Sequence, residues 1–301
     1  MPLKTPIQPY DKCSKHMIQH YGNSILRLAG VLDIPAWTPL QAELVHIRRF
    51  PDGVLEVPYP GQSSPDIFII EVATDPDARI PSQAVQDTAL VYLEREIVPE
   101  VIVLFLRKKR HLKPADSVTL RSRRGLTRWH LFWKAIKLWE VPAEELIALG
   151  DVGLLPWVPL AQFAGPPERF VSRCRARIDH QAPPLGHAEH QNLLAVTQLL
   201  LGLRSNQKNE PLLERLRALL GGRQAMMESP IYQEIVEESE RKGATEGKRE
   251  MLLNILVGRF GPAAKDLELE LKAVEFDRLD DLGLFAAKCR NLAAFRKRLL
   301  S

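Results

Sequence analysis

One apolar run with a single acid inside it constrains the fold of this chain more than any other feature. Residues 67–73 read Ile-Phe-Ile-Ile-Glu-Val-Ala, and an Asp-Pro or Pro-Asp pair flanks the run on each side. A continuous apolar run of this length between turn residues is typical of a buried central strand. An ionised carboxylate in such a strand is costly unless it is paired or binds a metal ion. Glu71 therefore needs a partner.

Asp52 is the best partner that the sequence offers to Glu71. Eighteen residues, 53–70, separate the two acids, which leaves room for a strand, a turn and most of a second strand. Acids on neighbouring strands can meet at one edge and hold a hard divalent cation. Asp66 is a poorer partner, because its odd offset from Glu71 places it on the opposite face of the strand. The alternative is that Asp52 belongs to a Pro-Asp-Gly turn and that Glu71 lies at the strand's exposed end.

Composition limits the class of protein. The chain has 301 residues, of which 45% are hydrophobic and 26% charged, as in an ordinary globular protein. The net charge is only +4, so affinity for nucleic acid has to come from a local patch. Three widely spaced cysteines argue against a disulfide framework and for a reducing compartment. No signal peptide and no apolar run of about 18 residues is visible, so we expect a cytoplasmic protein with no membrane partner.

The first part of the chain alternates between helical and strand patterns. Helical spacing predicts an opening helix over 10–30 and a second helix over 81–96, whose apolar face would hold Val85, Ala89, Tyr92 and Leu93. The first three strands are expected to form a meander, and the second helix then places the fourth strand parallel to the third. The predicted strands are 41–48, 53–59, 67–73 and 101–106.

These patterns predict an α/β core with a mixed sheet, followed by an all-α C-terminal region. A long charged helix is expected from the cap Ser229 towards Phe260, with interruptions at Gly243 and Gly247. The expected parts are a core over 10–110, a basic and Trp-rich extension over 111–180, a Pro-containing linker over 181–190, a helical region over 191–240 and a C-terminal helical module over 241–301.

A basic segment follows the last predicted strand of the core. Residues 107–128 contain nine Lys and Arg residues but one acid, Asp116. This imbalance favours a surface that contacts phosphates without reading sequence, although a solvated loop is the alternative. The nearby tryptophans are expected in the core. The residues expected to bind nucleic acid are Arg107, Lys108, Lys109, Arg110, Arg121, Arg123 and Arg124.

Several short motifs occur together in a recognisable order. Pro51-Asp52 is followed by Glu71-Val72-Ala73, by a helix ending in Val91-Tyr92-Leu93 and by the strand 101–106. The pattern resembles the recombination-promoting nuclease and transposase family of the PD-(D/E)XK nuclease superfamily. Other positions also resemble the family: Tyr10-Asp11 with Lys15 in the first helix, Arg48 or Arg49 ahead of the acid, and Gly153-Leu154-Leu155-Pro156 after the core. Residues 242–301 resemble a helical domain of unknown function that is often attached at the C-terminus.

The resemblance implies a restriction-endonuclease-like core that cleaves DNA with Mg²⁺ (or Mn²⁺), with a role in recombination or transposition. It carries over Asp52 and Glu71 as metal ligands. The family usually has Gln, and the superfamily Lys, where this chain has Ala73. Loss of one such donor typically costs about 10²–10³ in rate. Gln86 is the catalytic residue predicted to replace it, with Gln83 as the other candidate and Lys15 as a weaker one.

Two other functions stay open. The chain could be a nuclease fold that lost its chemistry and serves as a DNA-binding or assembly protein. It could also be an interaction module built on the helix from Ser229, which self-associates into a homo-oligomer through the C-terminal helices. Glu43 and Glu56 are further acids near the predicted site, but exposed positions are expected for both.

Overall fold

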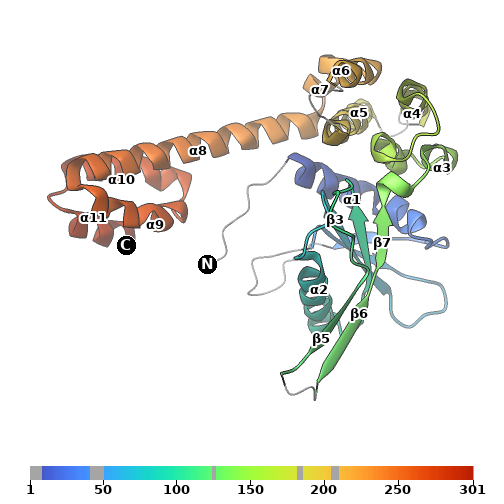
Figure 1. Cartoon of the computed structure of the whole chain (residues 1–301), viewed down its shortest axis with the longest axis horizontal. Coiled ribbons are helices and arrows are strands. Elements are labelled where there is room, and N and C mark those ends of the chain that lie inside the picture. Colours follow the sequence, from blue (N-terminus) through green and yellow to red (C-terminus); the bar gives the residue numbers. More distant parts are fainter. Residues whose placement is uncertain (1–8, 41–50, 124–126, 182–185, 205–209, 301) are drawn as a thin grey trace. The chain divides into compact units, whose positions relative to one another are not determined.

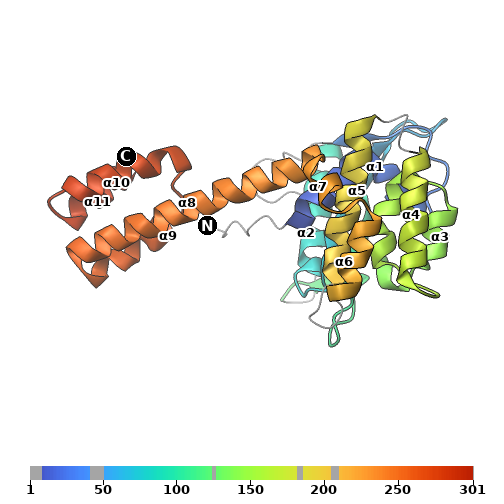
Figure 2. The ribbon, with the colours of Figure 1, turned by 90° about the horizontal axis from the view of Figure 1, so that it is seen from above.

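The computed structural model describes residues 9–40, 51–123, 127–181, 186–204 and 210–300. The chain divides into two compact units, Met1–Gln233 and Glu234–Ser301. Figures 1 and 2 show the elements of both units. The strand expected over 41–48, with Glu43, Arg48 and Arg49, lies outside the described residues.

The first unit is built on a mixed five-stranded sheet with the strand order β1-β2-β3-β4-β7 (Figure 1). The first three strands form an antiparallel meander, and β4 and β7 continue the sheet in parallel. This confirms an α/β core with a mixed sheet, including the parallel pairing of the two most apolar strands. The strands are β1 (Thr38–Leu40), β2 (Gly53–Val57), β3 (Asp66–Ala73), β4 (Glu100–Phe105) and β7 (Lys134–Lys137).

Two helices pack on opposite faces of this sheet. Helix α1 (Pro9–Leu28) lies so close to β2 that a Cβ atom on Gly53 would meet Ile18 Cγ2 at 2.1 Å. Helix α2 (Ile80–Arg95) packs on the other face, where its residues join the core formed by β3 and β4.

The buried face of α2 differs from the expected one. Tyr92 and Leu93 are 49% and 76% exposed, so the prediction that they face the core is wrong. Asp87 and Thr88 are buried instead, at 3% and 7% exposed. The face of α2 that packs on the sheet includes Ile80, Ala84 and Val91. The helix is therefore rotated about its axis relative to the prediction, and Asp87 faces the sheet. A buried face predicted from apolar residues alone cannot include an aspartate such as Asp87.

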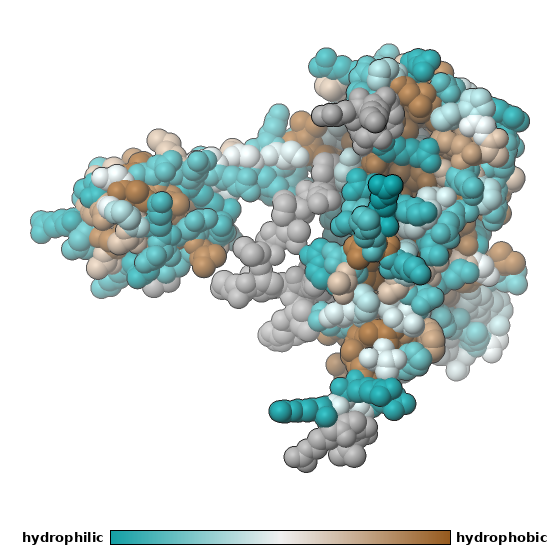
Figure 3. Space-filling view, in the orientation of Figure 1, coloured by the Kyte–Doolittle hydropathy of each residue, from teal (hydrophilic) through white to brown (hydrophobic). Residues whose placement is uncertain are grey.

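A two-stranded ribbon, β5 (Ser117–Arg121) with β6 (Arg128–Phe132), forms a sheet of its own. Trp133 joins β6 directly to β7, so the segment expected as an extension of the core supplies one strand of the core sheet. Figure 1 shows the base of the ribbon beside α2 and its free end pointing away from helices α3 to α7, which lie between residues 143 and 227. In the space-filling view, strongly hydrophilic residues lie beside a hydrophobic patch at that end (Figure 3).

A helical layer completes the first unit and holds α1 in place. Tyr21 Oη on α1 donates to Glu189 Oε1 at 2.5 Å, and Ser24 Oγ donates to Asp151 Oδ1 at 2.5 Å. Helices α4, α5 and α6 pack against one another (Figure 2). The elements are η1 (Leu138–Glu140), α3 (Ala143–Ala148), η2 (Val152–Leu160), α4 (Pro167–Gln181), α5 (His187–Leu201), η4 (Gly202–Arg204), α6 (Glu210–Leu219) and α7 (Gly222–Met227). The expected linker 181–190 thus has helix at both ends, and 182–185 lie outside the described residues.

The second unit is helical, as the sequence predicted. Helix α8 (Pro230–Phe260) passes through Gly243 and Gly247 without a break, so the expected interruption is wrong. Ser229 Oγ accepts from Tyr232 N at 3.3 Å, as expected of a cap. The C-terminal half of α8 shares a core with η5 (Pro262–Leu267), α9 (Glu268–Lys272), α10 (Phe276–Lys288) and α11 (Leu292–Leu300). No helix in the described ranges has the length and apolarity needed to span a membrane.

Candidate functional site

Asp52 and Glu71 meet at one end of the sheet. The antiparallel register of β2 and β3 reaches Gly53 opposite Ile70, which puts Asp52 level with Glu71. Val72 N donates to Asp52 Oδ2 at 2.8 Å, so the aspartate is fixed to the backbone beside the glutamate. The predicted pair is therefore brought together by strand pairing.

Glu71 is buried, at 6% exposed, and its two carboxylate oxygens have different surroundings. Gln83 Nε2 on α2 donates to Glu71 Oε2 at 2.5 Å. Asp87, one turn further along α2, lies close enough to Glu71 for its negative charge to raise the pKa of that carboxyl. Glu71 Oε1 is buried and has no hydrogen-bond partner among the described residues. A buried carboxylate oxygen without a donor is suited to a cation.

Helix α1 brings a second acid to Asp52. Asp11 and Lys15 both lie close enough to Asp52 for their charges to act on its carboxyl group. Lys15 Nζ pairs with Asp11 Oδ2 at 3.2 Å. We call Asp11, Asp52, Glu71 and Asp87 the carboxylate cluster. It joins the beginning of α1, the pair β2 and β3, and the first half of α2.

Burial controls the protonation of this cluster. Burial raises the pKa of Asp52 to about 7, opposed by the hydrogen bond from Val72 N and reinforced by the negative charge of Asp11. Burial also raises the pKa of Glu71 well above its usual value, and the charges of Asp52 and Asp87 add to this shift. Near neutral pH the cluster thus retains protons unless a cation compensates its negative charge.

The residues present fit a divalent cation held by two carboxylates. Among the described residues, no three His, Cys, Asp or Glu side chains are arranged to ligate one ion together. Mg²⁺ does not require such a cage, since it keeps several waters and commonly uses one or two carboxylates together with substrate phosphates. Asp52 and Glu71 would supply the two carboxylates.

Gln83, rather than Gln86, lies at the cluster. The side chain of Gln86 is exposed to solvent, whereas Gln83 is half-buried and contacts Glu71. Ala73 is half-buried at the end of β3 and supplies no polar group. Of the two glutamines that the sequence offers, the one nearer the helix start lies at the site.

Asp87 is a site residue that the sequence patterns did not single out. It lies four residues after Gln83 and four before the buried Val91, so all three share one side of α2. An acid in the middle of a buried helical face is the signal that could have identified it. Glu56 lies on β2, opposite Ile67 on β3 and several residues along the strand from Glu71. Glu56 is therefore not part of the carboxylate cluster.

The seven basic residues expected to bind nucleic acid do not form a single group in the structure. Arg107 Nε and Nη2 donate to Asp75 at 2.8 and 2.6 Å, which partly compensates the charge of Arg107. The hydrogen bonds from Arg107 lower the pKa of Asp75, and the charge of Lys109 adds to this shift. Arg124 lies outside the described residues. The remaining ones are exposed on the loop after β4 or towards the free end of the ribbon: Lys108, Lys109, Arg110, Arg121 and Arg123.

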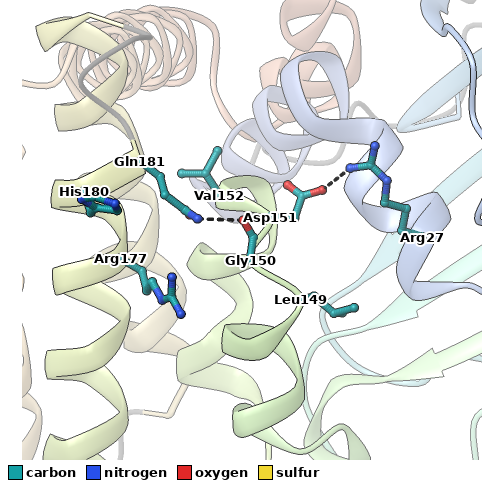
Figure 4. A pocket seen from close by; sticks show the side chains of 8 residues that line it. All are labelled: Arg27, Leu149, Gly150, Asp151, Val152, Arg177, His180 and Gln181. Atoms are coloured by element: carbon teal, nitrogen blue, oxygen red, sulfur yellow. Dashed lines mark hydrogen bonds and ion pairs between the residues drawn. The ribbon is translucent and has the colours of Figure 1, made fainter.

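A separate pocket lies between α1, α4 and the turn before η2, and no member of the carboxylate cluster lines it (Figure 4). Gln181 Nε2 donates to Gly150 O at 2.8 Å, and Arg27 Nη1 donates to Asp151 Oδ2 at 2.6 Å. These two bonds hold the walls of the pocket together, so Gln181 and the Arg27–Asp151 pair have structural roles there. The lining residues are Arg27, Leu149, Gly150, Asp151, Val152, Arg177, His180 and Gln181.

Comparisons of the chain with models of protein families, with curated proteins and with solved structures found no match. The likeness to a nuclease family is thus a likeness of short motifs. Any functional conclusion depends on the site itself.

Proposed function

We propose that the first unit is a PD-(D/E)XK-like nuclease core that cleaves phosphodiester bonds of DNA, with Mg²⁺ or Mn²⁺ held by Asp52 and Glu71. One observation carries this proposal. Two acids far apart in sequence lie opposite each other on paired strands, and Glu71 Oε1 is buried without a donor from the described residues. A purely structural acid at this position would be expected to have both oxygens satisfied.

A bound divalent cation would offset the charge of the scissile phosphate and lower the pKa of a water molecule. The protein's own part is to position groups around that phosphate. Gln83 presents an amide donor next to Glu71, where it can orient a water or a phosphate oxygen. Lys15 places a positive charge close to Asp52 from the other face of the sheet. Asp87 adds a further negative charge beside Glu71, which favours a cation at the cluster.

The proposal is tested by nicking of supercoiled plasmid DNA with Mg²⁺. The purified protein is compared with Asp52→Asn and Glu71→Gln, which remove one charge each and preserve volume. We expect each variant to lose at least about 10² in rate, as for other groups that stabilise charge at a reaction centre. Equal nicking by all three proteins would assign the activity to a contaminant and refute the proposal.

The alternative is a nuclease fold that binds DNA without cleaving it. Ala73, which lacks a donor, favours this alternative, as does the lack of a three-ligand group in the described part of the chain. It predicts binding that weakens with salt and no turnover with either metal. Links to recombination or transposition, and self-association through the C-terminal helices, stay predictions. The three buried free cysteines support the proposed reducing, cytoplasmic location.

A further inference from the structure

The β5–β6 ribbon is a firmly anchored arm. In the described residues its strands pair only with each other, from Ser117 opposite Phe132 to Arg121 opposite Arg128. Trp133 fixes its base, because Trp133 Nε1 donates to Ala115 O at 2.9 Å and Trp133 N donates to Asp116 O at 3.0 Å. The ribbon is thus held in one place relative to the five-stranded sheet.

The two faces of the ribbon differ. Val118 and Leu131 lie on one face and pack against the core of the sheet. The other face carries Thr119 opposite His130, with the rings of His130 and Phe132 at a centroid distance of 4.1 Å. Phe132 is 66% exposed, so this aromatic pair contributes little to the core. Packing within the fold therefore does not explain why the outer face carries these exposed aromatic side chains.

Two positive charges on the outer face repel each other when no anionic partner is bound. Arg121 and Arg128 are direct cross-strand partners, and both are exposed. Like charges in this arrangement destabilise a strand pair, which an anionic partner would reverse. Residues 107–137 hold eleven Lys and Arg residues but one acid, Asp116. The ribbon is therefore complementary to a polyanion that also offers apolar surface.

We propose that the ribbon lies in the major groove of duplex DNA. This groove is about 12 Å wide and admits a two-stranded ribbon, whose strands are about 4.8 Å apart. Arg121 and Arg128 would contact phosphates, while Phe132 would contact base edges such as the thymine methyl group. The inference deepens the proposed function, since it depends on DNA being the partner and states how the protein holds it.

The register also says which part of the DNA the ribbon would contact. Lys134 pairs with Ile102, so the ribbon leaves the sheet beside β4 and points away from the carboxylate cluster. A strand of five residues spans about 17 Å. The basic loop that begins at Arg107, paired with Asp75 just beyond β3, connects the cluster end of the sheet to the ribbon. The ribbon would therefore hold duplex that flanks the cleaved phosphate.

The test is fluorescence anisotropy with a DNA duplex of about 20 base pairs, roughly two helical turns. EDTA is present, so binding is measured without cleavage. The double variant Arg121→Ala/Arg128→Ala should bind at least about tenfold more weakly, and the slope of log Kd against log salt should fall by about 2. Arg121→Lys/Arg128→Lys should keep the slope. Phe132→Ala should weaken binding without changing the slope.

The matched control is Arg215→Ala/Arg223→Ala. It removes two exposed arginines from α6 and α7, which Figure 1 shows at the other end of the same unit. The control should bind like the unmodified protein, and melting temperatures should show that all variants fold. Unchanged binding and slope in the ribbon variant would overturn the inference. Equal ribbon-dependent binding to single-stranded DNA or to duplex RNA would also overturn it, because the major groove of RNA is too narrow for side chains to read.

The ribbon inference and the nuclease proposal can fail separately. Normal DNA binding by the ribbon variant, together with plasmid nicking that needs Glu71, would refute the ribbon and leave the nuclease. Ribbon-dependent binding of the duplex, together with no cleavage by the unmodified protein under any metal, would refute the nuclease and support the ribbon.

Discussion

Burial of Asp52 and Glu71 makes the carboxylate cluster sensitive to pH. The folded-state pKa of Asp52 is about 7, whereas the ordinary value is 3.8, so between these values the folded state binds more protons than the unfolded state. The free energy of unfolding must therefore fall as pH rises through this window, when no divalent cation is present. One unit of pKa shift corresponds to about 1.4 kcal/mol.

Glu71→Gln tests this at the level of one side chain. The variant removes a charge that burial disfavours, so in EDTA near pH 8 its free energy of unfolding should be higher than that of the unmodified protein. Its free energy of unfolding should also fall less steeply as the pH rises above 4.5, the ordinary pKa of a glutamate. Urea unfolding at several pH values measures both effects. An equally steep decline in the variant would show that Glu71 is not titrating as described.

Gln83 and Gln86 offer a matched comparison on one helix. Gln83→Ala should lower the rate of plasmid nicking by about 10²–10³, because it removes the amide donor next to Glu71. Gln86→Ala should leave the rate unchanged, since its side chain faces solvent. Single-turnover nicking assays measure both. A larger loss with Gln86→Ala than with Gln83→Ala would contradict the assignment.

The amino-acid sequence suggests Asp52 as the partner of Glu71, because the spacing leaves room for a strand, a turn and most of a second strand, and because alternation along the strand disfavours Asp66. The helix that supplies Gln83 and Asp87 is harder to orient. Its rotation depends on which side chains fit the sheet, and a pattern of apolar residues places Tyr92 inside although it is exposed. A buried acid at a functional site breaks the very pattern from which helix rotation is inferred.

At the level of elements, the contact between α1 and β2 depends on the absence of a side chain at Gly53. A Cβ atom there would meet Ile18 Cγ2 at 2.1 Å, and a β-branched side chain in a helix has little freedom to move away. Gly53→Ala should therefore destabilise the protein by about 1–3 kcal/mol. Thermal unfolding should show a melting temperature lower by several degrees.

Gly243→Ala is the matched control for this change. Nothing lies within 4 Å of a Cβ atom at Gly243, which is inside the continuous helix α8. The same substitution should here stabilise the helix by about 0.5–1 kcal/mol. A destabilisation of equal size at both glycines would show that close packing is not the cause at Gly53.

Most of the elements follow from periodicity, and the failures have physical causes. The ribbon strands do alternate, with Val118 and Leu131 on the inner face, but their charged neighbours obscure this signal. Helix α8 passes through two glycines because a glycine costs only about 1 kcal/mol in a helix, which its other residues can offset.

At the level of the whole molecule, two units have separate cores. The core of the second unit draws on the C-terminal half of α8 and on α9 to α11. The sequence separates an α/β part from an all-α part, but the boundary at Gln233 falls inside a helix. Helical periodicity runs through such a boundary unchanged, so sequence patterns cannot locate it.

Removal of residues 241–301 should leave the site intact. No member of the carboxylate cluster belongs to the second unit. The shortened chain should nick plasmid DNA at a rate within about twofold of the full chain, since distant, independent parts act nearly additively. Loss of nicking in a shortened chain with an unchanged circular dichroism spectrum of the first unit would show that the second unit takes part in the chemistry.

The central claim is that Asp52 and Glu71 share one divalent cation, and differential scanning calorimetry tests it directly. At a cation concentration of about 10–100 times Kd, binding should stabilise the unmodified protein by about 1–3 kcal/mol and raise Tm by several degrees. Asp52→Asn and Glu71→Gln should each abolish the rise with Mg²⁺ and with Mn²⁺. An equal rise in both variants, or no rise in the unmodified protein, would contradict the shared cation.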